Sequence, residues 1–171
     1  MSVVDSYIVF KQLDYASITS LNKRLQKQNN FLTLNQASQL IRDIDKQVKY
    51  MKNEGWGIVG LSVESIEIRN ETYIITDTSV LYQIRNGELF INRPVTISKQ
   101  YFMAPEVISI SYLPSYIPIQ TIYYSCAKLI LKYLTGRDNM NGLEELKNLP
   151  IYYFIDRCLE TDPTKRKYIL L

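Results

Sequence analysis

The segment 117–134 constrains the fold more than any other part of the sequence. Its apolar residues cover nearly the whole circumference of a helix, and they are Ile119, Ile122, Tyr123, Cys126, Leu129, Ile130, Tyr133 and Leu134. A helix that is apolar on all sides is normally buried, so the pattern predicts a central helix that ends at Gly136. A chain of 171 residues, 46% of them apolar, can bury one such core, and we expect a single domain over 1–171.

A second helix is expected over 33–54. Thr33 and Gln36 fit a capping box, in which a hydroxyl and an amide each satisfy a free backbone donor. Apolar residues then recur at three- and four-residue steps, and they are Ala37, Leu40, Ile41, Ile44, Val48 and Met51. The spacing predicts an amphipathic helix with one face on the core.

The hydrophobic period changes to two after residue 57. It predicts strands over 63–68 and 72–76, and a hairpin centred on Asn86-Gly87. Further helices are expected over 17–28 and within 143–166. Helical patterns outnumber strand patterns, so the sequence predicts a mainly α fold (α+β) with short β-hairpins.

Histidine is absent from the sequence. This removes imidazole acid–base catalysis and every histidine-containing metal site. Cys126 and Cys158 lie in apolar helical patterns and fit buried free thiols, which indicates an intracellular protein. Twenty basic and seventeen acidic residues leave a net charge of only +3, so we expect no nucleic-acid partner. No apolar stretch is long enough to span a bilayer, so we expect no membrane partner.

Four segments, in order, resemble the C-terminal lobe of eukaryotic protein kinases. Residues 57–77 are similar to the catalytic loop with the magnesium-binding aspartate, and 101–107 contain Ala-Pro-Glu. Residues 124–136 resemble the buried central helix with its closing Thr-Gly, and 155–166 end on Asp-Pro-x-x-Arg. The resemblance implies a kinase C-lobe-like helical domain.

The resemblance extends over nearly the whole chain. It implies a hinge-like strand in 1–13, the long helix 33–54, the degenerate catalytic loop and magnesium-aspartate region 57–77 and the Ala-Pro-Glu segment 101–107. The central buried helix would occupy 118–136 and the late helices 143–166. Nothing before residue 1 supplies the glycine-rich loop, so the N-lobe is expected to be absent.

The positions that carry kinase catalysis hold other residues. The family's catalytic loop reads H-R-D-L-x-x-x-N, and Gly60 and Leu61 stand in place of its His-Arg pair. Ser62 occupies the position of the base and cannot accept a proton near pH 7. Glu64 replaces a phosphate-facing lysine, and Glu67 stands at the magnesium-binding asparagine. The resemblance therefore implies a protein that is not an enzyme and needs no cofactor.

Two acidic positions retain family residues or their chemistry. Asp77 matches the magnesium aspartate and, with Glu67, could form a weak residual metal site; the alternative is an aspartate that caps a turn. The resemblance also implies a structural ion pair between Glu106 and Arg166, which would be costly to break if buried.

These observations predict a noncatalytic pseudokinase that acts as a protein–protein interaction module. The candidate interaction surface contains Tyr7, Val9, Tyr112 and Tyr116, because tyrosines supply apolar area with one polar end. The partner would be a protein kinase that the chain modulates by mimicking its C-lobe, the N-lobe of such a kinase, or a second copy through self-association.

Other functions stay open at this point. One is a scaffolding component, cellular or virion, and others are residual nucleotide binding or an unusual phosphotransferase. Abundant Ile, Asn, Lys and Tyr fit an A/T-rich genome such as that of a large DNA virus, although many cellular genomes share this bias. The expected compartment is the cytoplasm, or the virion for a viral protein.

Overall fold

The structure is a computed structural model that describes residues 18–168. Its composition is mixed, with 44% helix and 21% strand, and the strands form three antiparallel sheets. The predicted mainly α class is therefore wrong. The difference comes from short strands that were not expected, among them β9 (Ser115–Pro118), which joins the expected hairpin in a four-stranded sheet.

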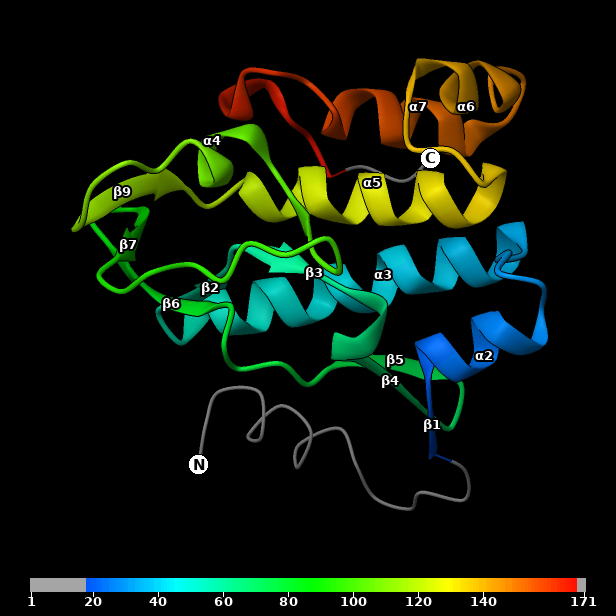
Figure 1. Ribbon diagram of the computed structural model, residues 1–171, viewed down its shortest axis with the longest axis horizontal. Helices are drawn as coiled ribbons and strands as arrows, with labels where there is room; N and C mark the ends of the chain where they lie inside the picture. Colours follow the sequence, from blue (N-terminus) through cyan, green and yellow to red (C-terminus); the bar gives the residue numbers. More distant parts are fainter. Residues whose placement is uncertain (1–17, 169–171) are drawn as a thin grey trace.

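The central helix is α5 (Thr121–Thr135), which lies between α3 (Leu34–Asn53) and α7 (Pro150–Cys158) (Figure 1). Its inward residues, including Cys126, Leu129 and Ile130, are fully buried. The described residues also contain the helices α2 (Leu21–Lys27), α4 (Pro105–Ile108) and α6 (Met140–Glu145). The expected start of the central helix at 118 is wrong, because Pro118 ends a strand and the helix begins at Thr121.

Helix α3 begins and ends as its sequence predicts. The Thr33 hydroxyl accepts a hydrogen bond from the Gln36 backbone, and the Gln36 side chain accepts one from the Thr33 backbone. Beyond the helix, Gly55 has a φ of 81°, a left-handed conformation that glycine adopts without steric cost. The helix presents its apolar face to the core and its charged face to solvent.

The strands of the described residues form three sheets (Figure 1). The first has the order β1-β4-β5 (Ile18–Ser20, Ile66–Arg69, Thr72–Ile75). The second has the order β2-β6-β7-β9 (Trp56–Ile58, Leu81–Arg85, Glu88–Ile91, Ser115–Pro118). The third pairs β3 (Gly60–Leu61) with β8 (Phe102–Met103). The hairpin around Asn86-Gly87 is present as β6 and β7.

Several predicted boundaries change in the structure. The segment 17–28 contains strand β1 before its helix, because Ser20 caps α2. The predicted strand 63–68 opens with a 3₁₀ turn (Val63–Ser65). The late helices expected over 143–166 are α6, α7 and a 3₁₀ turn (Pro163–Lys165). Helix α6 begins at residue 140, before the expected range. The hinge-like strand in 1–13 lies outside the described residues.

Two polar side chains of α3 close the free edge of β5. Asp43 accepts a hydrogen bond from the Tyr73 backbone N–H at 3.0 Å. Gln47 donates to the Tyr73 carbonyl and accepts from the Ile75 N–H, both at 2.8 Å. The Gln47 amide thus bonds to β5 as a peptide unit of a neighbouring strand would, and the buried edge has its hydrogen bonds satisfied.

Candidate functional site

We call residues 60–77 the degenerate catalytic region. Its first strand, β3, pairs with β8, so that Gly60 lies opposite Met103 and Leu61 opposite Phe102. A Cβ atom on Gly60 would lie 2.9 Å from Met103 Cγ and 3.2 Å from the Phe102 carbonyl oxygen. Gly60 is therefore the residue that lets the segment before Ala-Pro-Glu approach this closely.

Ser62, which the resemblance to kinases would place at the base position, has a structural role. Its hydroxyl accepts a hydrogen bond from the Ser65 N–H at 3.1 Å, and the Ser65 hydroxyl accepts one from the Ser62 N–H at 3.0 Å. Only 2% of Ser62 is exposed. A buried hydroxyl that caps a turn in this way cannot reach the hydroxyl of a substrate.

Glu64 and Glu67, two of the three glutamates in residues 60–77, have separate partners. Glu64 accepts a hydrogen bond from the Asn22 side chain. Glu67 forms an ion pair with Arg69, with 2.7 Å between Arg69 Nε and Glu67 Oε2. Glu67, which the sequence suggested as a metal ligand, is thus already paired with the guanidinium of Arg69.

Both carboxylate oxygens of Asp77 accept hydrogen bonds from the protein. Ser79 donates its backbone N–H at 2.9 Å and its hydroxyl at 2.6 Å to one oxygen, and the Tyr101 hydroxyl donates at 2.6 Å to the other. Partial burial alone would raise the pKa of Asp77, but these hydrogen bonds outweigh it and hold the pKa below its usual value. The geometry matches the turn-capping alternative.

The sequence did not indicate two of the residues that fix this loop. One is Tyr101, described above, and the other is Arg93, which donates to the carbonyls of Ser79 at 3.2 Å and Leu81 at 2.7 Å. The Arg93 guanidinium also lies 3.9 Å from the centre of the Tyr82 ring. No local sequence pattern around an arginine or a tyrosine indicates that it will bond to a distant loop in this way.

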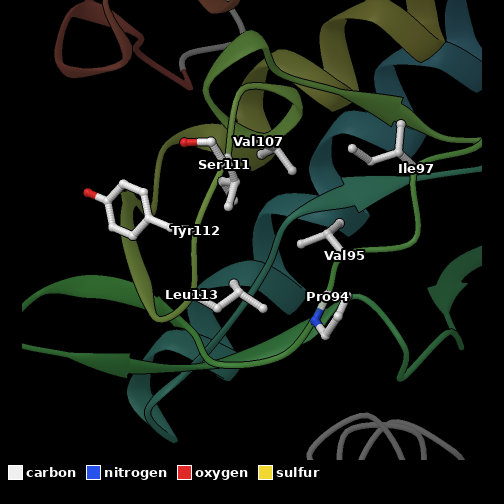
Figure 2. A pocket seen from close by; sticks show the side chains of 8 residues that line it. Pro94, Val95, Ile97, Val107, Ser111, Tyr112 and Leu113 are labelled. Carbon is white, nitrogen blue, oxygen red and sulfur yellow. The ribbon is translucent and has the colours of Figure 1, made fainter.

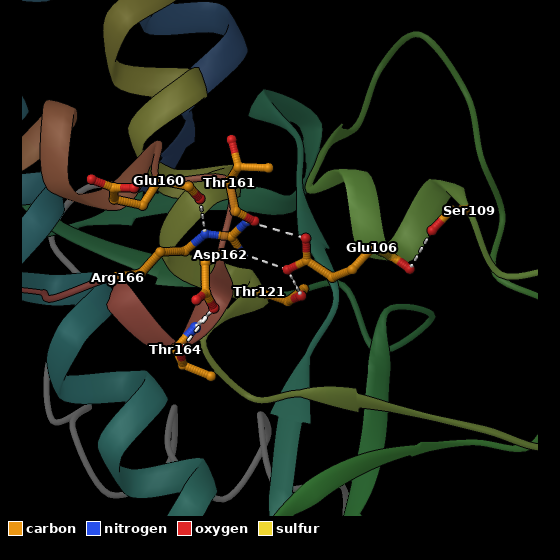
Figure 3. A network of polar contacts seen from close by, with 8 residues as sticks. All are labelled: Glu106, Ser109, Thr121, Glu160, Thr161, Asp162, Thr164 and Arg166. Atoms are coloured by element: carbon orange, nitrogen blue, oxygen red, sulfur yellow. Dashed lines mark hydrogen bonds and ion pairs between the residues drawn. The ribbon is translucent and has the colours of Figure 1, made fainter.

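Glu106 and Arg166 form an ion pair that connects α4 to the end of the chain (Figure 3). The Arg166 side chain is fully buried and contacts both carboxylate oxygens of Glu106, one of them at 3.1 Å. It also donates to the Glu160 carbonyl at 2.8 Å, while the Thr121 hydroxyl donates to Glu106. Burial opposes ionisation of Glu106, yet the hydrogen bonds from Arg166 and Thr121 keep its pKa below the usual value.

The cysteines are buried free thiols within the helical layer. Burial raises the pKa of Cys126 to about 12 and raises that of Cys158 as well. Thiols with such pKa values stay protonated at neutral pH, which makes them poor nucleophiles. Across residues 18–168, no three His, Cys, Asp or Glu side chains are grouped to hold a metal ion.

An exposed apolar groove lies between two loops, one after β7 and one after α4. We call it the apolar groove, and Figure 2 shows Pro94, Val95 and Ile97 on one side and Val107 and Leu113 facing them. Its volume is about 390 Å³, within the range of ligand-binding clefts. None of the described residues that line it carries a charge.

Two of the predicted interaction residues lie at this groove or beside it. Tyr112 lines its rim and is 73% exposed. Tyr116 of β9 is exposed and packs against Phe90 with its ring tilted, with 5.2 Å between ring centres. Tyr7 and Val9, the other two, lie outside the described residues. The groove itself was not predicted, although the run from Val107 to Ala127 contains no charged residue and could have signalled it.

Within residues 18–168, no helix combines the length and the apolar character needed to cross a membrane. Neither the scan against protein-family models nor the search of curated proteins found a match to this chain. The resemblance to protein kinases therefore stays a prediction that rests on the motifs of the sequence.

Proposed function

We propose that the chain is a noncatalytic protein related to the kinase C-lobe and that it acts by binding another protein chain. The observation that carries the proposal is the state of the two positions that phosphoryl transfer needs most. Ser62 is buried in a reciprocal cap with Ser65, and both oxygens of Asp77 are engaged by Ser79 and Tyr101. A kinase needs a base that reaches the substrate hydroxyl and a carboxylate that is free to hold magnesium.

The distribution of exposed apolar side chains supports the binding role. Five large ones lie between residues 97 and 116, namely Ile97, Ile108, Tyr112, Leu113 and Tyr116. Within the described part of the chain, residues 35–96 contain none. Clustered apolar area on a protein surface is typical of a contact site for another protein.

Modulation of another kinase by C-lobe mimicry is the narrower form of the proposal. Such mimicry would use the surface around the degenerate catalytic region, where the described side chains are buried or polar. The exposed apolar area lies on 97–116 instead, which favours a scaffolding contact through that segment. Binding of a purified protein kinase that is abolished by Glu64→Lys but not by Tyr112→Lys would reverse this preference.

Thermal unfolding with nucleotide tests the noncatalytic part of the proposal. A ligand that binds only the folded state raises the melting temperature in a concentration-dependent manner. We expect ATP with magnesium or manganese to leave the melting temperature unchanged. Asp77→Asn is the matched control, because it keeps an oxygen that can accept from Ser79, while the charge is lost and the oxygen that accepts from Tyr101 becomes an NH₂ group. A saturable rise in the wild type that is lost in Asp77→Asn would contradict the proposal.

A further inference from the structure

Both cysteines of the sequence contact the same two residues, Lys167 and Tyr168, which we call the strap. The Cys158 thiol donates a hydrogen bond to the Lys167 carbonyl, with 3.5 Å between sulfur and oxygen. The Cys126 sulfur lies 3.4 Å from the Tyr168 hydroxyl. One short segment therefore contacts two thiols that belong to different helices, α5 and α7.

The Tyr168 side chain fixes the strap to three helices. Its hydroxyl donates a hydrogen bond to the Ile41 carbonyl of α3 at 2.7 Å. Its ring packs against Tyr123 of α5 and Phe154 of α7, with 4.9 Å between ring centres in each case. The ring thus occupies the place where α3, α5 and α7 meet, next to the thiol of α5.

The strap is held more weakly than the residue before it. Arg166 is buried and paired with Glu106, whereas Lys167 and Tyr168 belong to no helix or strand. Among residues 18–168, the strap bonds to the helices only through the Tyr168 hydroxyl and through sulfur, which is a weak hydrogen-bonding atom. A segment with so few bonds opens at a lower free energy than the whole domain unfolds, so the strap can leave while Arg166 stays in place.

The closed strap keeps the two thiols unreactive. Both cysteines are fully buried, and burial raises the pKa of Cys126 to about 12. Exchange with a disulfide needs a thiol that is both accessible and ionised. Departure of the Tyr168 ring would bring water to the thiols and lower their pKa toward the ordinary value.

We propose that the strap opens while the domain stays folded, and that its opening makes Cys126 and Cys158 sites of thiol–disulfide exchange with small-molecule disulfides. In each exchange the cysteine loses its proton to solvent, and the thiolate attacks one sulfur of the disulfide. A new S–S bond forms as the old one breaks, and the electron pair of the broken bond leaves on the released thiolate. The small disulfide is the only oxidant that this step needs. The inference goes beyond the proposed function and does not depend on it.

Thiol labelling of the folded full chain tests the opening. The probe is DTNB, an aromatic disulfide that releases a coloured thiolate, used at about pH 8 and in up to about 2 M urea. Local opening exposes little surface, so the rate should hardly change in low urea and should rise steeply only where the whole domain unfolds. A rate that follows the full urea dependence of global unfolding from the lowest concentration would overturn the proposal.

Tyr168→Phe distinguishes opening of the strap from unfolding of the domain. It keeps the ring and removes the hydroxyl that bonds to Ile41, so the rate in low urea should rise about fivefold. Gly60→Ala is the matched control, because Gly60 lies against Met103 and Phe102 and a similar loss of global stability is expected there. The control should label at the wild-type rate in low urea. An equal rise in both variants, or no rise in Tyr168→Phe, would overturn the proposal.

Single-thiol variants show whether one strap covers both cysteines. Cys126→Ala leaves only the thiol of Cys158, and Cys158→Ala leaves only that of Cys126. Each variant should keep the urea-independent rate and its rise on Tyr168→Phe. Intact mass should show one mixed disulfide per chain, which dithiothreitol removes. In either variant, a remaining thiol that does not respond to Tyr168→Phe would contradict the common opening and overturn the proposal.

Discussion

The degenerate catalytic region and the segment 94–116 differ in what they offer to other molecules. In residues 60–77 the polar side chains bond to the protein itself, as Ser62 does to Ser65 and Asp77 to Ser79 and Tyr101. In residues 94–116 large apolar side chains remain exposed around an uncharged groove. One region thus satisfies its polar groups internally, whereas the other presents exposed apolar side chains to its surroundings.

The largest effect on this comparison is expected from Arg166, because it holds α4, in the middle of the segment 94–116, through Glu106. Arg166→Met would leave the Glu106 carboxylate half-buried without its cation, which we expect to cost roughly 3–5 kcal/mol of unfolding free energy. Urea denaturation measures the loss. Arg137→Met is the control, because the Arg137–Glu145 pair is exposed and should contribute at most about 1 kcal/mol. Equal losses in the two variants would contradict the role of Arg166.

The Glu106–Arg166 ion pair makes the stability of the folded protein depend on pH. The pKa of Glu106 in the folded protein lies below its ordinary value of 4.5. A carboxyl group of this kind contributes stability above the pKa of the unfolded chain, and the contribution is lost as the pH falls through the folded value. The wild type should therefore lose stability in acid more steeply than Arg166→Met.

Asp43 tests the region 60–77, because it accepts a hydrogen bond from strand β5, which belongs to that region. Asp43→Ala would leave the buried Tyr73 N–H without an acceptor and should cost about 1–3 kcal/mol. Asp43→Asn keeps an acceptor oxygen and should leave the stability at neutral pH equal or higher. A loss as large as that of Asp43→Ala in the asparagine variant would show that the charge, and not the acceptor, matters.

The stability of the wild type and that of Asp43→Asn should change differently with pH, and the direction of the difference follows from the pKa of Asp43. Burial raises the pKa of Asp43, although hydrogen bonds from the Tyr73 backbone and Gln39 and the charges of Lys46 and Arg42 oppose the shift. Stability from a carboxyl with a raised pKa is present below the unfolded pKa and is lost as the pH rises through the folded value. Asp43→Asn should abolish this loss, so its stability should change less with pH above 3.8, the ordinary value for aspartate.

Gly60 connects the two regions and should give the smallest effect. Gly60→Ala would place a methyl group against Met103 and the Phe102 carbonyl, which should cost about 1–2 kcal/mol after the lower entropy of the unfolded chain is included. In a double-mutant cycle, Gly60→Ala should cost less in a Met103→Ala background, because Met103→Ala removes the side-chain atoms nearest to the new methyl group. Strictly additive losses would mean that β3 and β8 do not press together at this position.

Sequence patterns located the helices well, because burial imposes a regular spacing. The capping box at Thr33 and the apolar circumference around Ile130 appear in the structure as α3 and α5. Five strands, β1, β2, β3, β8 and β9, were missed, since each has only two to four residues and too short a pattern to show a period. That omission also made the predicted mainly α class wrong.

The candidate site was predictable only in part. The motifs singled out Glu106 and Arg166, which the structure joins, and Asp77, which it places in a capped turn. The groove is built from two separate segments, 94–97 and 107–113, which meet only in the folded chain, so the uncharged run after Val107 could indicate one of its sides at most. The contacts of Arg93 and Tyr101 arise in the same way from tertiary structure.

The bonds from Gln47 to β5 bear on aggregation. A strand with free N–H and C=O groups can recruit further strands and seed fibrils. Because a glutamine amide occupies the Tyr73 carbonyl and the Ile75 N–H, this hairpin offers no template for polymerisation along that edge. Two side chains of α3, Gln47 and Asp43, thus keep this β-branched strand from pairing with a strand of another molecule.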